Sequence, residues 1–337
     1  MIVTENSTYR LMQTNLDRIT NRLQDLRYQG ATGIKLNNPS DDPASIRPVL
    51  TTRTQIRNTE RYLETMGVSL DEMESTDSHL EHVENIFQRA KEIGINAINA
   101  GYNTEDLNVL ADEIQFLTQE LFDAANGMVD GKYIFAGYQE NTVPFVENPA
   151  YTDAGYVATD STTWPVFYHG DGYPTELEIT PGEFLEVNLT GNELFMGINN
   201  AAVQAGGPTD VTGYASDAGR TDLFSALRRL EDSIRSGNIN DPALPGGGIE
   251  QSLDVIDLAA DQNRRQRSQL GNRARRVEDA ILQQQDVKID LEQILSRYQD
   301  ADAIETFNDI VQQETAFQAA LNVSARISTI SILDYFK

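Results

Sequence analysis

Two histidines, His79 and His82, have the spacing in this sequence that best suits a metal site. On a helix, residues three apart lie on one face, where two imidazoles can bind one zinc ion. The sequence supplies no evident third ligand, and Glu81 and Glu84 beside the histidines are typical of an exposed polar helix face. We therefore predict an exposed helix face at this position and no bound metal or other cofactor.

The acidic pair Asp41 and Asp42 lies in a loop with a proline on either side. Such a pair could bind a cation, but the spacing of an EF-hand is absent. A residue of this type more often caps the helix that follows, and proline is favoured as the first helical residue. We predict that Asp41 or Asp42 caps a helix that begins at Pro43.

Six arginines within thirteen residues form a basic band that could bind nucleic acid or pair with an acidic helix over residues 60–92. The chain carries a net charge of −26, which disfavours phosphate binding and favours ion pairs. The band consists of Arg264, Arg265, Arg267, Arg273, Arg275 and Arg276. We expect no nucleic-acid partner.

Catalytic motifs are absent from the sequence. Gly246–Gly248 lacks the Lys-Ser/Thr pair of a P-loop, and neither HExxH nor a Ser-His-Asp order occurs. The chain has no cysteine, which excludes disulfides and a thiol nucleophile. No run is long and apolar enough to span a membrane, and the N-terminus lacks the apolar region of a cleaved signal peptide. We predict a protein that is not an enzyme and has no membrane partner.

The helix predicted over residues 9–28 carries a seam of apolar residues spaced 3, 4, 3, 4 and 3 apart. This is the a/d pattern of a coiled coil, and it places all six side chains on one stripe. A single helix of this length gains stability mainly by packing its stripe, so it needs a partner. The seam residues are Tyr9, Met12, Leu16, Ile19, Leu23 and Leu26.

A looser apolar stripe near the C-terminus is the partner that we expect for this seam. Its residues are Ile304, Phe307, Ile310, Val311, Phe317, Ala320, Leu321, Ile327 and Ile330. Between the two ends, heptad patterns predict helices over residues 49–90, 104–128 and 253–298, with a break at Gly101 and Thr104 as a cap. The longest of these has polar residues at four seam positions, which weaken packing but can set register.

Residues 139–219 differ from the rest of the chain, because they carry 12 acidic and no basic residues. Short apolar segments between Gly, Pro and Asp turns predict strands over 133–137, 144–146, 164–168, 177–179 and 184–189. We interpret 139–219 as a small β-rich insertion that faces outward, and the fold as mainly α: a long antiparallel helical rod, coiled-coil-like, with paired N- and C-terminal helices.

Several stretches of this sequence resemble the bacterial flagellin superfamily. The linker with Asn38, Pro39, Asp41, Asp42 and Pro43 is similar to the one that joins the first two helices of that family. Tyr-Ile-Phe-Ala-Gly at 133–137, the region around Leu270-Gly271 and the ending at 330–336 also resemble it. These segments are more similar to the type at the hook–filament junction than to filament-forming flagellin, which stays the alternative.

The resemblance implies a structural subunit of the flagellum with a layered domain order. Residues 1–44 and 296–337 would form the inner tube, with the seam residues and Phe307, Val311, Phe317, Leu321 and Ile327 between subunits. Residues 45–138 and 220–295 would form the rod helices, and 139–219 the outward insertion. Expected partners are flagellin subunits, the first hook-associated protein, other copies of the chain, and a cytosolic export chaperone on the C-terminal helix. The location would be extracellular, after export without a cleaved signal peptide.

Overall fold

The computed structural model describes residues 2–38, 42–99, 101–240 and 247–335, and the side chains of these except 2–6, 8, 154 and 327–335. Pro39 and Asp41 of the linker and the side chain of Ile327 therefore lie outside the description. The chain divides into two compact units. The first comprises residues 1–61 and 285–337, and the second comprises residues 62–284.

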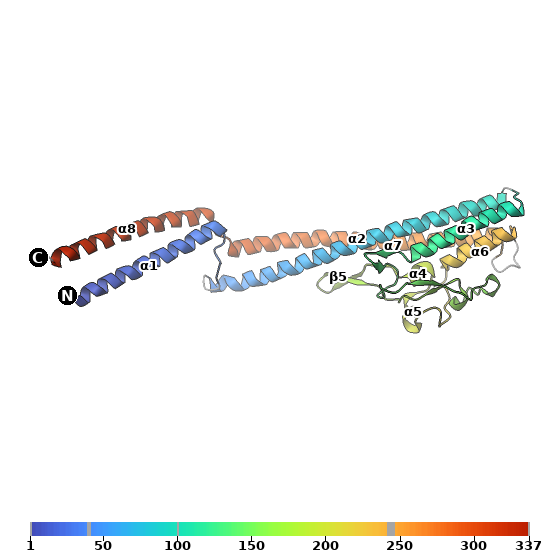
Figure 1. Cartoon of the computed structure of the whole chain (residues 1–337), viewed down its shortest axis with the longest axis horizontal. Coiled ribbons are helices and arrows are strands. Elements are labelled where there is room, and N and C mark those ends of the chain that lie inside the picture. Colours follow the sequence, from blue (N-terminus) through green and yellow to red (C-terminus); the bar gives the residue numbers. More distant parts are fainter. Residues whose placement is uncertain (1, 39–41, 100, 241–246, 336–337) are drawn as a thin grey trace. The chain divides into compact units, whose positions relative to one another are not determined.

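The first unit is helical and contains both ends of the chain. Helices α1 (Ile2–Thr32) and α8 (Ala303–Tyr335) run antiparallel beside each other, as Figure 1 shows. The unit also holds the beginning of α2 (Pro43–Asn99) and the end of α7 (Ile249–Gln299). The predicted pairing of the terminal helices is confirmed, and α1 extends beyond the predicted range of 9–28 at both ends.

Helix α2 begins at Pro43, as predicted, and Asp42 caps it. The Asp42 carboxylate accepts hydrogen bonds from the backbone N–H of Ala44 at 3.0 Å and from the Ser45 hydroxyl at 2.6 Å. These two bonds, that of Ser45 first, lower the pKa of Asp42 because they favour its charged form. The loop carboxylate thus has the capping role that its position before a helix indicates.

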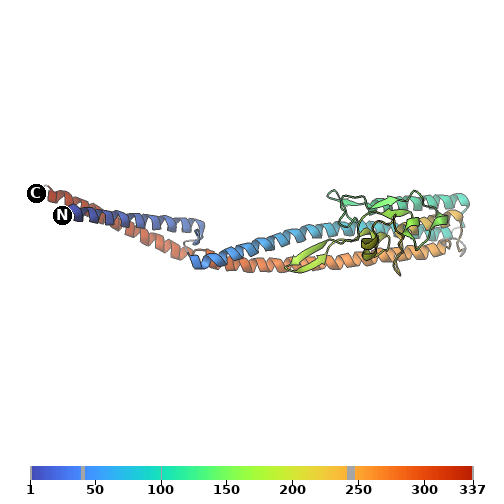
Figure 2. The same cartoon turned by 90° about the horizontal axis from the view of Figure 1, so that it is seen from below.

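The second unit is built on a helical bundle. Its members are the remainder of α2, α3 (Thr104–Ala125), α6 (Leu223–Ser236) and the first part of α7, seen side by side in Figures 1 and 2. The cap of α3 differs from the prediction: Asn103, one residue before Thr104, accepts the hydrogen bond from Asp106 N at 2.9 Å. An asparagine caps as well as a threonine, so the sequence pattern alone placed the boundary one residue too late.

The predicted seam of α7 packs against α2 in this unit. Met66, Met73 and Leu80 of α2 are almost fully buried, as are Leu270 and Val277 of α7. Fully burying one such side chain contributes about 1.5–3 kcal/mol relative to leaving it in water.

The polar seam residue Asn263 is also completely buried in this pairing. Its Nδ2 donates to the backbone oxygen of Leu80 at 2.9 Å. This contact fixes one relative position of the two helices, because a slip along the seam would leave a buried amide without its acceptor.

The arginine band is divided between two sets of carboxylates. Arg267 pairs with Asp77 at 2.7 Å and with Glu81 at 2.9 Å, and Arg264 pairs with Glu84 at 2.6 Å. These contacts confirm the predicted pairing of the band with the acidic part of α2.

The other two arginines of the band that form ion pairs reach the β region instead. Arg276 pairs with Glu183 at 3.2 Å. Arg273 pairs with Glu186 and donates to the backbone oxygen of Asn188 at 3.0 Å. The band therefore joins α7 to the β region as well as to α2.

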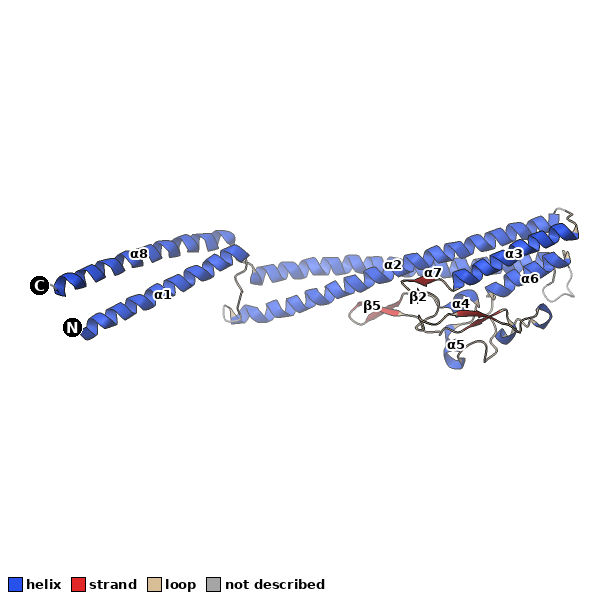
Figure 3. Ribbon diagram, viewed as in Figure 1, coloured by secondary structure: helices blue, strands red, loops and turns tan. Residues whose placement is uncertain are grey.

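The β-rich region consists of three separate two-stranded antiparallel hairpins (Figure 3). They pair β1 (Met128–Val129) with β2 (Lys132–Tyr133), β3 (Phe145–Glu147) with β4 (Val166–Tyr168), and β5 (Glu176–Thr180) with β6 (Glu183–Glu186). Short helices α4 (Gly191–Phe195) and α5 (Asn200–Gly206) and 3-10 turns η1 (Asp153–Gly155) and η2 (Ser161–Thr163) complete it. Of the strand predicted over 133–137, only Tyr133 is in a strand, and a turn follows it.

An aromatic cluster makes the β region and the helices share one core. Phe224 of α6 lies 5.5 Å from Phe145 and 5.9 Å from Phe195, measured between ring centroids. Trp164 and Tyr168 are fully buried in the same cluster. Because its largest apolar side chains pack on α6, segment 139–219 depends on the bundle for its core.

The start of α6 places a carboxylate in this core. Asp222 caps the helix, accepting from the backbone N–H of Ser225 at 2.8 Å and from the Ser225 hydroxyl. Its side chain is almost completely buried. Burial raises the pKa of Asp222 to about 6, although the hydrogen bonds from Ser225 and Phe224 act in the opposite direction.

We predict that Asp222→Asn changes how stability depends on pH. The folded-state pKa of about 6 lies above the ordinary value of 3.8, so the stabilising contribution of the protonated form is lost as pH rises through 6. The free energy of unfolding of Asp222→Asn, relative to the wild type, should therefore increase by roughly 1.4 kcal/mol from pH 5 to pH 8. Urea unfolding at several pH values measures it.

The control variant is Asp222→Ala, which removes the cap as well as the charge. It should be less stable than Asp222→Asn by about 1 kcal/mol at every pH. A constant difference between the wild type and Asp222→Asn across this pH range would contradict the assignment.

Candidate assembly surface of the terminal helices

The predicted seam of α1 faces α8, and its burial increases along the helix. Leu23 and Leu26 are buried, with 7% and 3% of their surfaces exposed. Met12, Leu16 and Ile19 are half-buried, and Tyr9 is 69% exposed. The seam is therefore covered by α8 mainly in its second half.

The facing side of α8 is a regular seam. Its covered positions are Thr306, Ile310, Gln313, Phe317, Ala320 and Ser324, which alternate four and three residues apart. A Cβ atom on Gly30 would lie 3.3 Å from Ile310 Cδ1, so the glycine of α1 allows close approach of the two helices. Arg27 pairs with Glu314 at 2.7 Å, and Lys35 N bonds to Gln299 O at 2.8 Å after the end of α1.

The stripe predicted for α8 separates into two groups in the structure. Phe317 lies on the seam that faces α1, whereas Phe307, Val311 and Leu321 are 66%, 48% and 46% exposed. The prediction that these residues all cover the α1 seam is therefore wrong. Residues 304, 307 and 311 lie about 100–160° around the helix from the seam, and the looser spacing of the sequence pattern merged the two stripes.

Phe307 and Val311 form a second apolar stripe together with Ile304, which we call the outer stripe of α8. Leu11 of α1 is also 65% exposed, at a position that the heptad pattern assigned to no seam. Its apolar type at an off-seam position was the signal available in the sequence. Adjacent exposed apolar side chains of this size mark an interaction surface.

The predicted linker is partly described. Asn38 is exposed, Asp42 caps α2 and Pro43 is the first residue of that helix. The backbone after α1 is held to the start of α8, since Ala301 N donates to Gly33 O at 2.8 Å.

His79 and His82 are not brought together with a third ligand. His82 Nε2 lies 3.2 Å from Glu120 Oε1 of α3, while His79 lies against Gly127. Burial and the nearby His82 lower the pKa of His79. Within the ranges that the structure describes, no three His, Asp or Glu side chains form a possible metal site.

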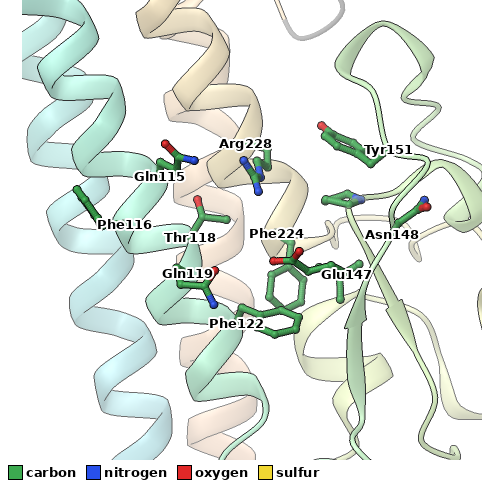
Figure 4. Close-up of a pocket in the computed structure, with 12 residues that line it drawn as sticks. Gln115, Phe116, Thr118, Gln119, Phe122, Glu147, Asn148, Tyr151, Phe224 and Arg228 are labelled. Carbon is green, nitrogen blue, oxygen red and sulfur yellow. The ribbon is translucent and has the colours of Figure 1, made fainter.

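A hollow of about 380 Å³ lies beside α3 in the second unit (Figure 4). Phe122 and Phe224 line it together with Glu147 and Arg228, from α3, α6 and β3. Among the described residues, no helix is long and apolar enough to cross a membrane.

Paired terminal helices, a helical bundle and a β region within the same chain define a subunit of the flagellin superfamily. The family model for the bacterial flagellin N-terminal helical region matches residues 3–140. The chain is 26% identical to flagellar hook-associated protein 3 of Escherichia coli K12 over 350 residues, which cover 98% of this chain and 99% of that protein. Over nearly its whole length the chain is thus similar to flagellar hook-associated protein 3, a structural flagellar component and not an enzyme.

Solved structures share the fold. A flagellar hook-associated protein from Vibrio parahaemolyticus aligns with a TM-score of 0.59 and 14% identity, over 77% of this chain and 100% of that one. The flagellar junction protein of Legionella pneumophila aligns with a TM-score of 0.52 and 18% identity, over 76% and 100%.

We predict that Leu23→Asp opens the terminal helix pair and leaves the second unit folded. A buried leucine replaced by a charged residue loses several kcal/mol of packing and solvation, more than this short seam can compensate. Limited proteolysis with mass spectrometry should show cleavage within α1 and α8 and protection of residues 62–284.

The matched control is Leu11→Asp, because Leu11 lies on the same helix but is exposed. In this variant, α8 should resist proteolysis as well as it does in the wild type. Equal cleavage of the two variants would show that burial against α8 does not hold the pair together.

Proposed function

We propose that the chain forms the adaptor layer between the first hook-associated protein and the flagellin filament, with copies of itself as lateral neighbours. The observation that carries this proposal is the outer stripe of α8. Ile304 and Phe307 are 77% and 66% exposed, on a helix whose other apolar face is already occupied by α1. A chain that presents such a stripe beside a completed intramolecular pair is suited to joining further helices around it.

In this proposal the α1–α8 pair belongs to the inner tube. The predicted seam residues Leu23 and Leu26 hold the pair together within one copy, and the outer stripe contacts neighbouring copies. The start of the α1 seam, where Tyr9 is exposed and Met12, Leu16 and Ile19 are half-buried, supplies a second contact region. Pairing within one copy and contact between copies therefore fall to different residues, whereas the sequence analysis had given both roles to the same seam residues.

The same stripe supports the proposed route out of the cell. An exposed apolar helix face promotes aggregation before assembly, so a cytosolic chaperone that covers α8 keeps the chain soluble. Export through the flagellar type III apparatus, without a cleaved signal peptide, places the chain at the extracellular junction. Because the chaperone covers the outer stripe until export, neighbouring copies can bind the stripe only after export.

Self-assembly distinguishes an adaptor from a filament-forming flagellin. The purified chain is mixed with short filament seeds in an assembly-promoting salt and observed by electron microscopy. An adaptor binds seed ends without growth of its own, whereas long filaments composed of this chain alone would refute the proposal.

We predict that Phe307→Asp abolishes incorporation at the junction without changing the monomer. The side chain is 66% exposed, so its replacement should alter the free energy of unfolding by no more than about 0.5 kcal/mol. Incorporation is measured by immunogold labelling of flagella, and folding by circular dichroism.

Gln312→Asp is the control for this prediction, because it adds the same charge at an exposed position of α8 outside the outer stripe. It should incorporate as the wild type does. Normal immunogold labelling of flagella with the Phe307→Asp variant would show that the outer stripe makes no assembly contact.

A further inference from the structure

The exposed face of α3 combines apolar and acidic side chains. Val109 and Phe116 are 68% and 75% exposed, and their spacing of seven residues puts them on one side of the helix. Helix α3 carries six acidic and no basic residues, of which Glu105, Asp112 and Asp123 lie on this same side. We call these five residues the acidic stripe of α3.

Part of the negative charge of this stripe is not neutralised within the chain. Asp112 pairs with Arg235 at 2.9 Å, but Glu105 and Asp123 have no ion pair within the described part of the chain. In Figure 4, Phe116 projects from α3 on the side away from Glu147, at the edge of the hollow that it helps to line. The acidic stripe therefore offers two apolar contacts between carboxylates.

The start of α2 carries the opposite arrangement. Residues 43–61 contain four arginines and one acidic residue. Arg47, Leu50, Thr54 and Arg57 are spaced 3, 4 and 3 apart, on the side of the helix opposite the buried residues Val49, Thr52 and Thr59. We call these four residues the basic stripe of α2.

The apolar and charged members of the basic stripe are accessible. Leu50 is 57% exposed. Arg57 donates only to Thr54 Oγ1, at 3.4 Å, and neither Arg47 nor Arg57 forms an ion pair with a carboxylate of the described residues. The stripe thus presents one apolar side chain between two guanidinium groups.

The two stripes match in length as well as in charge. Ten residues separate Arg47 from Arg57, and eleven separate Asp112 from Asp123, which correspond to roughly 15 Å and 16 Å along an α-helix. In a parallel alignment, Leu50 falls opposite Phe116 while the two arginines fall opposite the two aspartates. Complementary charge fixes such a register and disfavours pairing of either stripe with itself.

We propose that the acidic stripe of α3 in one copy binds the basic stripe of α2 in a second copy. Leu50 packs against Phe116, and Arg57 pairs with Asp123. Because the two surfaces are different, the contact is heterologous, and each copy can bind one neighbour through each stripe. This inference rests on the proposed function, since it specifies how copies join within the layer.

Engineered cysteines test this contact, because the natural chain has none. Full chains carrying Leu50→Cys and Phe116→Cys are prepared separately, mixed at high concentration and oxidised. We expect mixed disulfide dimers in excess over the dimers of either variant alone. Replacing Leu50→Cys by Val68→Cys, an equally exposed position on α2, should give no such excess.

Absence of a mixed excess, or an equal excess with Val68→Cys, would overturn the proposal. A charge exchange gives an independent measure. Arg57→Asp in the first chain should abolish the mixed dimer, and Asp123→Arg in the second chain should restore it. Circular dichroism of each variant verifies folding before oxidation.

The assembled flagellum provides the final test. A photo-crosslinker attached at Phe116→Cys should yield a product of two copies of this chain. Labelling of the wild type at the junction, together with adducts of Phe116→Cys to other flagellar proteins only, would overturn this contact and leave the adaptor function intact. Absence of the wild type from the junction would instead overturn the proposed function.

Discussion

An apolar stripe on a long helix must be covered by another helix, and this constraint organises both units of the chain. In the second unit, Met66, Met73 and Leu80 of α2 are covered together with Leu270 of α7. In the first, Leu23 and Leu26 of α1 are covered by α8. Hydrogen bonds within a helix are satisfied without a partner, so side-chain packing decides which helices lie together.

Polar contacts add register to this packing. The buried Asn263 bonds to a backbone oxygen of α2, and Arg267 pairs with Asp77 on the same helix, so α2 and α7 have one favoured alignment. Arg276 extends the same band to the β5–β6 hairpin. Isolated exposed ion pairs contribute little stability, so the main effect of these pairs is to fix the alignment of the elements that they join.

The helical part of the fold could be predicted from the sequence because heptads report directly on which side of a helix is buried. The pairing of the termini, the cap at Asp42 and the contacts of Arg264 and Arg267 follow from local patterns and charge. The separation of Phe307 from Phe317 could not, because both positions suit a loosely drawn stripe and only a partner distinguishes them. The packing of Phe145 on Phe224 was equally hidden, because no local pattern links residues so distant in sequence.

The Arg27–Glu314 pair joins residues 287 positions apart within the first unit, and all of the second unit lies between them in the sequence. Helix α1 is synthesised before residues 62–284, and its partner α8 is synthesised after them. A chain emerging from a ribosome or a narrow channel therefore delivers α1 with its seam uncovered, while residues 62–284 can already close their own core. Contacts of such long sequence separation form late, so the α1–α8 pair closes only after residues 62–284 have been synthesised.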